Sequence, residues 1–273
     1  MRHGQLKFAG ALCVGLLVSC AIPANAGDGY GDAAPVGDSF GISVGGFVVA
    51  APKYEGASDY RVIGFPVVVP SFGSAESRVQ VKGADDVRFR VFEHSGFEFG
   101  PLAGWRFGRD EEDGDRLTGL GDVDGGLVIG GYMAYQLGVL KPFLSYHHQV
   151  TGDDGGGILR FGTEAKTYLA RGIELTGTVG ASYADSNYMD SYFSINTAQA
   201  AASVAGLTAY DADAGVKDVF IGLSASMPIA EQWTLRMTTR YSHLVGDAAD
   251  SPIVESESQL SGGLGITYRF PVR

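Results

Sequence analysis

The residues best suited to chemistry are neighbours in the chain. Ser242 is followed by His243, with Asp247 and Asp250 close behind, and hydrolases use these residue types as nucleophile, base and orienting acid. The surrounding residues alternate between apolar and polar, as a strand does, and neighbours on a strand point to opposite faces. Ser242 and His243 therefore cannot pair, so no catalytic residue is predicted and we expect a protein that is not an enzyme.

A metal site is not predicted either, for a similar reason. His147 and His148 are also neighbours in a strand-like segment and would face opposite sides. The acidic run 109–116 (RDEEDGDR) offers oxygen ligands for a hard cation, but it lacks the spacing of an EF-hand loop. We interpret the run as a solvated loop that could share divalent ions with lipopolysaccharide phosphates. No metal-binding or cofactor-binding residue is predicted.

The overall charge excludes one class of partner. The 273 residues contain 31 Asp and Glu against 20 Lys and Arg, a formal net charge of −11. Nucleic-acid binding needs a basic surface to meet the phosphates, so no nucleic-acid partner is expected. Hydrophobic residues make up 45% of the chain, which is enough for an ordered fold rather than a disordered one.

The first 26 residues have the pattern of a signal peptide. A positive start is followed by the apolar stretch 8–18 and by Ala24-Asn25-Ala26, a small-x-small cleavage site. We expect cleavage after Ala26. An alternative is a lipoprotein signal, because Leu17-Val18-Ser19-Cys20 resembles a bacterial lipobox whose cysteine would be lipidated. Both cysteines, Cys13 and Cys20, lie in this leader, so cleavage after Ala26 would leave no thiol chemistry.

After the leader, residues 27–39 are expected to form a flexible periplasmic arm, and residues 40–270 a single β-domain. A first count gives eleven strands. A turn at 83–86 divides one of them, which gives twelve, an even number; the alternative count is ten strands. The twelve expected strands lie near 40–51, 59–71, 77–82, 86–92, 96–107, 121–136, 139–150, 157–169, 172–184, 217–228, 231–244 and 258–270.

The clearest strands have one apolar and one polar face, as in 173–183, 219–227, 233–241 and 260–270. Periodicity alone also allows a soluble sandwich. However, the segments run longer than the usual strand of about 5–6 residues and match the roughly 9–11 needed to cross a bilayer. The sequence therefore predicts an all-β fold, a transmembrane antiparallel β-barrel of about twelve strands in the bacterial outer membrane.

The alternation assigns side chains to the lipid or to the lumen. The residues expected to face lipid near the midplane are Leu175, Val179, Leu223, Leu235 and Leu264. Thr267 is expected to face the lumen, as are four arginines, Arg160, Arg236, Arg240 and Arg269. We expect these arginines to pair with inward acids such as Glu164 and Glu174, in a lumen that is narrow or filled by side chains.

Short and long connections are expected to alternate. Tight turns near 137–138, 171–172 and 229–231 are predicted to face the periplasm, and longer loops the outside. One long loop contains a predicted helix over 197–205. Its expected N-cap is Asn196, with Gln199 completing a capping box and Gly206 as the stop.

Four segments carry a family resemblance: YEGASDYR (54–61), AYDADAGVKDV (209–219), GDAADSPIV (246–254) and GGLGITYRF (262–270). Together, and in this order, they resemble the MipA/OmpV family of outer-membrane proteins. The resemblance implies a barrel without established catalytic residues. It also implies partners, namely a murein lytic transglycosylase and a penicillin-binding murein synthase. In this chain Phe270 is followed by three further residues, whereas the family usually ends on the phenylalanine.

The expected function is therefore that of a non-enzymatic scaffold for periplasmic murein-remodelling enzymes, set among outer-membrane lipid and lipopolysaccharide. Two alternatives stay open. The polar inward faces and the net acidity allow a narrow channel for small, cationic solutes. Residues 185–216 and the last long loop allow a surface adhesin or antigen.

Overall fold

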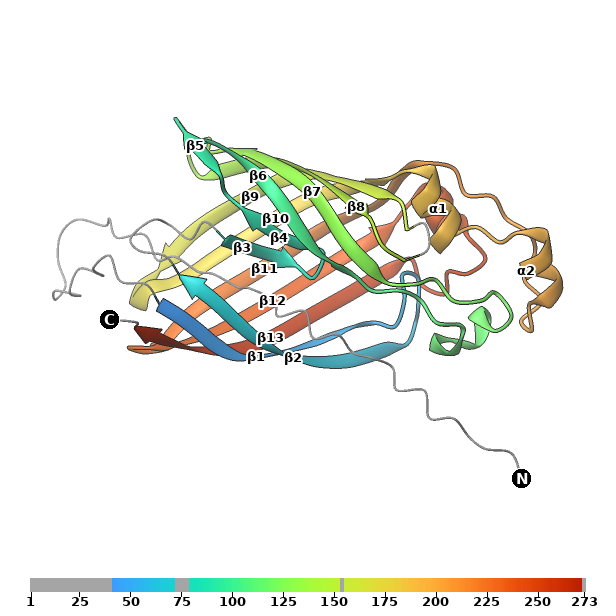
Figure 1. The fold of residues 1–273 in the computed structure, drawn as a ribbon, viewed down its shortest axis with the longest axis horizontal. Coiled ribbons are helices and arrows are strands. Elements are labelled where there is room, and N and C mark those ends of the chain that lie inside the picture. The colour runs from blue at the N-terminus through green and yellow to red at the C-terminus, as the bar shows by residue number, and fades with distance from the viewer. Residues whose placement is uncertain (1–40, 72–78, 153–154, 272–273) are drawn as a thin grey trace, which may run out of the picture.

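The computed structural model describes residues 41–71, 79–152 and 155–271. Thirteen strands and several short helices make up this part of the chain (Figure 1). The strands are β1 Gly41–Pro52, β2 Tyr60–Ser71, β3 Val79–Gly83, β4 Asp86–Phe89, β5 Phe92–His94, β6 Phe97–Arg106, β7 Gly126–Tyr135, β8 Leu140–Gln149, β9 Gly157–Leu169, β10 Ile173–Ala184, β11 Gly215–Ala230, β12 Trp233–Leu244 and β13 Ser258–Pro271.

All strands belong to one sheet, in which β1 joins β13 and the chain otherwise follows a meander. The order is β2-β1-β13-β12-β11-β10-β9-β8-β7-β6-β4-β3, and β5 pairs with β6 beside this path. Tilted strands curl around a common axis in Figure 1. The prediction of about twelve antiparallel strands is confirmed. The expected strand 86–92 is divided into β4 and β5, and the strand expected from residue 121 begins only at Gly126. Residues 72–78 lie outside the described part.

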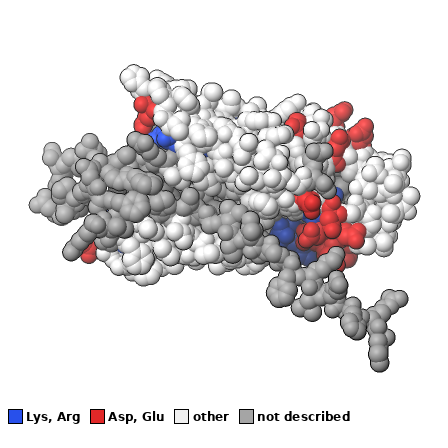
Figure 2. All heavy atoms as spheres, viewed as in Figure 1, with Lys and Arg blue, Asp and Glu red and all other residues white. Residues whose placement is uncertain are grey.

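The outer face is apolar, with the register that the alternation predicts. Val179, Leu223 and Leu264 are 53%, 48% and 51% exposed, although large apolar side chains normally avoid water. Thr267, on the opposite face of β13, is only 5% exposed. On the face seen in Figure 2, the Lys, Arg, Asp and Glu side chains gather toward the two ends of the molecule. In the described residues, no helix is both long and apolar enough to cross a membrane.

One end of the barrel, here called the turn end, has short connections. The β9–β10 turn is the single 3₁₀ turn Ala170–Gly172, and β11 and β12 are separated by only two residues. Arg171 and Gly172 both have positive φ, 63° and 70°, the backbone twist that suits a hairpin between right-twisted strands. Aromatic side chains ring this end, including Phe92, Phe97, Phe99, Trp233 and Tyr268. Such belts mark a membrane–water interface.

The other end, here called the cap, consists of long loops that contain helices. They include α1 Ser186–Tyr192, α2 Thr197–Ala202 and α3 Gly246–Asp250, and the 3₁₀ turns η1 Glu111–Asp113 and η2 Asp115–Leu117. The predicted helix begins at Thr197 with Asn196 and Gln199 forming the capping box, as expected. It ends at Ala202 instead of residue 205. Helices α1 and α3 were not predicted.

Candidate functional site

The tip of the β3–β4 hairpin lies inside the lumen. Asp85, at the tip, accepts two hydrogen bonds from Arg160 of β9, at 2.9 and 2.7 Å. Lys82 of β3 donates to Glu164 of β9 at 2.7 Å. In the sheet, β3 and β9 are separated by β4, β6, β7 and β8, so these contacts cross the interior. The hairpin therefore fills part of the lumen, held by two ion pairs to the opposite wall.

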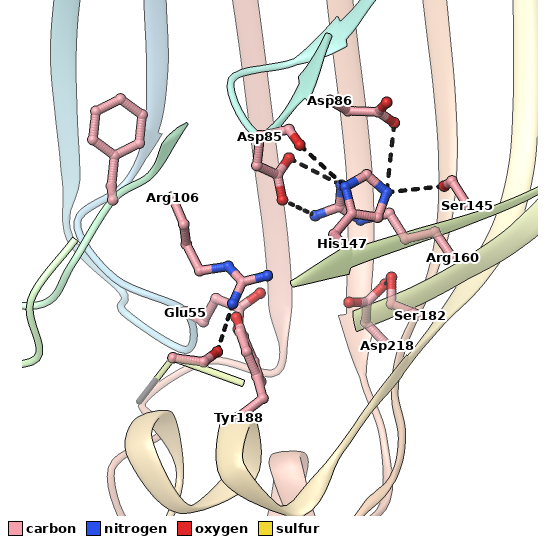
Figure 3. A network of polar contacts seen from close by, with 12 residues as sticks. Glu55, Asp85, Asp86, Arg106, Ser145, His147, Arg160, Ser182, Tyr188 and Asp218 are labelled. Atoms are coloured by element: carbon pink, nitrogen blue, oxygen red, sulfur yellow. Dashed lines mark hydrogen bonds and ion pairs between the residues drawn. The ribbon is translucent and has the colours of Figure 1, made fainter. Parts of the chain in front are cut away.

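His147 is the centre of the polar contacts behind this hairpin (Figure 3). Its side chain is fully buried, and its Nδ1 lies 3.1 Å from the backbone oxygen of Asp85. A carbonyl oxygen only accepts, so Nδ1 donates, and in the neutral ring Nε2 accepts from the Ser145 hydroxyl at 2.9 Å. Beside it, Arg88 donates to both carboxylate oxygens of Asp86 at 2.8 and 2.9 Å. The buried side chains of Arg88 and Asp86 are thus paired with each other, which offsets the cost of burying two charges.

A second ionic cluster closes the lumen toward the cap. The pairing of β10 with β11 jumps from Ser182–Asp218 to Tyr183–Val216, so Lys217 is the extra residue of a β-bulge. A bulge re-aims side chains, and here Lys217 and Asp218 are both buried although they are neighbours. Lys217 Nζ lies 2.6 Å from Asp218 and 2.5 Å from Glu55, and Ser182 also donates to Asp218 at 3.0 Å.

Tyr188 of α1 joins this cluster to the cap. Its hydroxyl donates to Glu55 at 2.8 Å. The guanidinium of Arg106 lies 4.9 Å from its ring centre, within cation–π range. Arg106 Nη1 also donates to the backbone oxygens of Gly155 and Gly156, at 2.5 and 3.0 Å. Tyr188 therefore ties helix α1 to the β1–β2 connection through Glu55 and to the end of β6 through Arg106, which in turn binds the β8–β9 connection.

Four long loops pack together into the cap. One apolar cluster contains Tyr188, Met189, Tyr192, Phe193, Leu244 and Ala248, and a second contains Tyr54, Ala57, Leu117, Leu120, Ile195 and Ile253. Segments that carry the family resemblance meet here. Ser58 of YEGASDYR donates to Glu255, just after GDAADSPIV, at 2.5 Å. The backbone N–H of Asp213 donates to Asp247 at 2.9 Å.

Burial keeps the phenols of the cap neutral. It raises the pKa of Tyr54 and of Tyr192 to about 12, and that of Tyr188 well above its ordinary value. These groups therefore stay protonated at neutral pH and act as hydrogen-bond donors and packing surfaces. Conversely, the hydrogen bond from Ser58 lowers the pKa of Glu255, because it stabilises the carboxylate form.

The structure separates the candidate catalytic and metal-binding pairs, as predicted. Ser242 pairs with the buried, inward Phe220, whereas the His243 ring lies against Glu257 at 3.5 Å in the neighbouring loop. His147 is buried in the lumen, and its neighbour in the strand faces outward. Within the described ranges, no three His, Cys, Asp or Glu side chains come together as a metal site.

Arg160 and Arg240 pair with inward acids, as predicted, but not with the two acids that were named. Arg160 pairs with Asp85 of the hairpin, and Arg240 lies 3.6 Å from Asp218. The predicted acids, Glu164 and Glu174, each pair with a lysine instead. The turn at 83–86 was predicted, but its place in the lumen was not. A short strand pair rich in charge (VQVKGADDVRF, 79–89) was the available signal, because such residues do not suit a lipid-facing wall.

Long strands with an apolar outer face, a belt of aromatic side chains at one end and a charged, filled interior define an outer-membrane β-barrel. The family model described as MltA-interacting protein MipA matches residues 44–270. The chain therefore belongs to the MipA family, and the resemblance seen in the sequence is confirmed.

Several curated outer-membrane proteins are similar to the chain. Omp26La of Vibrio anguillarum is 33% identical over 36% of this chain and 37% of its own length. OmpV of Vibrio cholerae is 33% identical over 36% of each chain. The MltA-interacting protein of Escherichia coli is 28% identical over 44% of this chain and 47% of its own. The matched stretches thus span less than half of each relative. With these relatives, the family and the fold place the protein in the outer membrane.

Among solved structures, similarity extends to an outer membrane channel of Pseudomonas putida F1. It is 11% identical, covers 90% of this chain and 100% of that one, and gives a TM-score of 0.40. The N-terminal barrel of Pseudomonas aeruginosa OprF is 14% identical, with coverage of 65% and 98% and a TM-score of 0.29.

Proposed function

We propose that this protein is a non-enzymatic scaffold, which holds periplasmic murein-remodelling enzymes at the outer membrane. The observation that carries the proposal is the filled lumen. The ion pairs of Asp85 and Lys82 with β9 place a hairpin across it, and Tyr188 covers its cap end. A barrel filled in this way is suited to anchoring and docking rather than to free diffusion of solutes. The relative named for its interaction with MltA supports the same reading.

The docking surface lies at the turn end, because murein enzymes work in the periplasm and short turns face it. The aromatic belt places the membrane interface close to these turns, so little of the barrel projects beyond it. The exposed turns offer far less than the roughly 800 Å² per partner of a standard stable interface. The contact is therefore weak or multivalent, and gains strength from the shared location at the wall.

The test is capture of a lytic transglycosylase and a penicillin-binding murein synthase from crosslinked membranes. In the turn variant, residues 27–39 are deleted and Arg171 and Glu231 are reversed in charge. In the matched cap variant, the exposed Val204 and Asp211 are changed to lysine, which leaves the packed cap intact. We expect capture to fall only in the turn variant. Loss only in the cap variant would favour a surface adhesin and overturn the scaffold.

A narrow channel is the second candidate, because Ser224 and Thr238 point inward and are nevertheless exposed. The inner wall thus borders solvent in at least one place. Steady single-channel conductance of the intact protein in a planar bilayer would favour the channel, and a silent bilayer would favour the scaffold.

A further inference from the structure

A solvent-exposed patch on the inner wall is flanked by two arginines. Ser224 of β11 and Thr238 of β12 are directly paired, and the neighbouring inward pairs are Ser226–Arg236 and Gly222–Arg240. Arg236 and Arg240 therefore stand on either side of the two hydroxyls, about 7 Å from Thr238 along the strand. Both hydroxyl residues are exposed although they face the lumen, so the space in front of them is open to solvent.

The two arginines are poorly neutralised. Nε and Nη1 of Arg236 are buried and lack a hydrogen-bond partner in the part of the chain that is described. Arg240 stacks on Phe220, 3.7 Å from its ring centre, and its nearest acid, Asp218, is already bonded to Lys217 at 2.6 Å. The two Arg236 nitrogens are shielded from solvent, so an anion in the open space would meet the remainder of its guanidinium group.

The exposure of neighbouring residues indicates from which end of the barrel the patch is accessible. On the cap side, Ser182, Asp218 and Phe220 are only 1%, 3% and 6% exposed, so these three side chains barely meet solvent. Toward the turn end, Ser226 and Thr234 remain partly exposed. We therefore expect solutes to reach the open space from the turn end.

We propose that Arg236, Arg240, Ser224 and Thr238 form a binding site for small anions that carry a phosphate or carboxylate group. Guanidinium groups bind both groups in a bidentate manner, and the two hydroxyls between them supply further donors. The inference does not depend on the scaffold proposal, since the site faces the lumen and not a partner protein. A site of this kind would favour anions over cations at this part of the inner wall, although the chain as a whole is acidic.

Reaction of an introduced thiol measures the local potential directly. Thr238→Cys is labelled with an anionic and with a cationic methanethiosulfonate reagent of similar size, and the ratio of the two rates is recorded. Val204→Cys, an exposed position in the cap, gives the reference ratio. The unsubstituted chain, labelled in parallel, reports any reaction of Cys13 or Cys20. The protein is held in a non-ionic detergent, so no lipid phosphate is present.

We expect the anionic reagent to be favoured at position 238 over position 204 by roughly fivefold or more, since each of the two arginines, at about 7 Å in water, contributes about 0.6 kcal/mol. Arg236→Gln should reduce this preference, whereas Arg171→Gln, on the exposed turn, should not. Inorganic phosphate should slow the anionic reagent at position 238 more than chloride at equal ionic strength does.

Equal ratios at the two positions, or a ratio unchanged by Arg236→Gln, would overturn the proposal. So would a lack of protection by phosphate, which would leave a solvated patch that binds no anion. Ser224→Cys repeats the measurement across the strand pair in case Thr238→Cys fails to fold. If neither thiol reacts in the folded protein, the space is closed and the site does not exist.

Discussion

The most direct test of the barrel is to place one charge on each of its faces at the same height. Leu264 lies near the middle of β13, is 51% exposed and points outward. Its partner on β12 is Met237, and the next residue on β12, Thr238, points inward. Leu264→Arg and Thr238→Arg therefore differ in the face that carries the charge, and hardly in depth within the membrane.

The two substitutions are expected to lower the free energy of unfolding by different amounts and for different physical reasons. On the lipid face near the midplane, an arginine destabilises a barrel by about 2–4 kcal/mol, which is a factor of roughly 30 to 1,000 in the unfolding equilibrium. On the lumen face the guanidinium stays hydrated and is opposed only by Arg236 and Arg240. Two like charges at about 7 Å in water repel by about 0.6 kcal/mol each, so we expect a cost near 1 kcal/mol.

The assay is reversible denaturant unfolding of protein folded into lipid vesicles, with identical lipid for the wild type and both variants. The slope of free energy against denaturant should be the same for all three, so that midpoints report stability alone. A cost for Thr238→Arg equal to or above that of Leu264→Arg would refute the assigned faces. A shift of one residue in register exchanges the two faces of a strand. The larger stability loss therefore identifies the face that contacts lipid.

Three further outcomes follow from the structure. Asp85→Asn should lower the free energy of unfolding by about 3 kcal/mol. This is the low end for a broken buried ion pair, because the side chains of Asp85 and Arg160 are still 16–18% exposed. In the double variant, Arg160→Gln should add little to this loss; additive losses would mean that the two side chains do not interact. Ser58→Ala should lower the free energy of unfolding more at neutral pH than at pH 3. The Ser58 hydrogen bond lowers the pKa of the Glu255 carboxyl, so it contributes stability above the ordinary pKa of about 4.3, and this contribution is lost as the pH falls through the folded-state pKa. An equal effect at both pH values in denaturant unfolding would argue against this bond. Intact-mass measurement should give a mature chain that starts after Ala26 without lipid, and a diacylglycerol-sized addition would contradict this.

The wall of the barrel could be predicted because it is encoded locally. Each strand shows its two faces through a period of two, and the outward positions of Leu264 and Val179 follow from that period alone. The tight turn at 171–172 was likewise visible as a short polar break between two alternating segments. Such features need no knowledge of which strands are neighbours.

The interior could not be predicted, because its contacts join distant parts of the chain. Lys82 and Glu164 are 82 residues apart, and the charge of segment 79–89 indicates only that it avoids lipid, not which wall it contacts. The bulge at Lys217 was also hidden, since simple alternation assigns neighbouring residues to opposite faces. Helix α1 has only seven residues, too short to be stable alone, and its position depends on packing against the cap.

The segments that identify the family serve the cap and the lumen. Glu55 of YEGASDYR binds Lys217 of AYDADAGVKDV, and Asp247 of GDAADSPIV binds the backbone of Asp213. In GGLGITYRF, Gly263 and Gly265 leave room for the ring of Phe47, which would lie 2.4 and 2.0 Å from any Cβ added there. The first three segments meet at the cap, whereas Gly263 and Gly265 receive Phe47 in the middle of the β1–β13 pair. The segments that mark the family therefore build the cap and part of the β1–β13 pair, whereas we expect a periplasmic partner to contact the tight turns, which lie outside these segments. For that reason capture must be measured on turn variants of this chain and not inferred from its relatives.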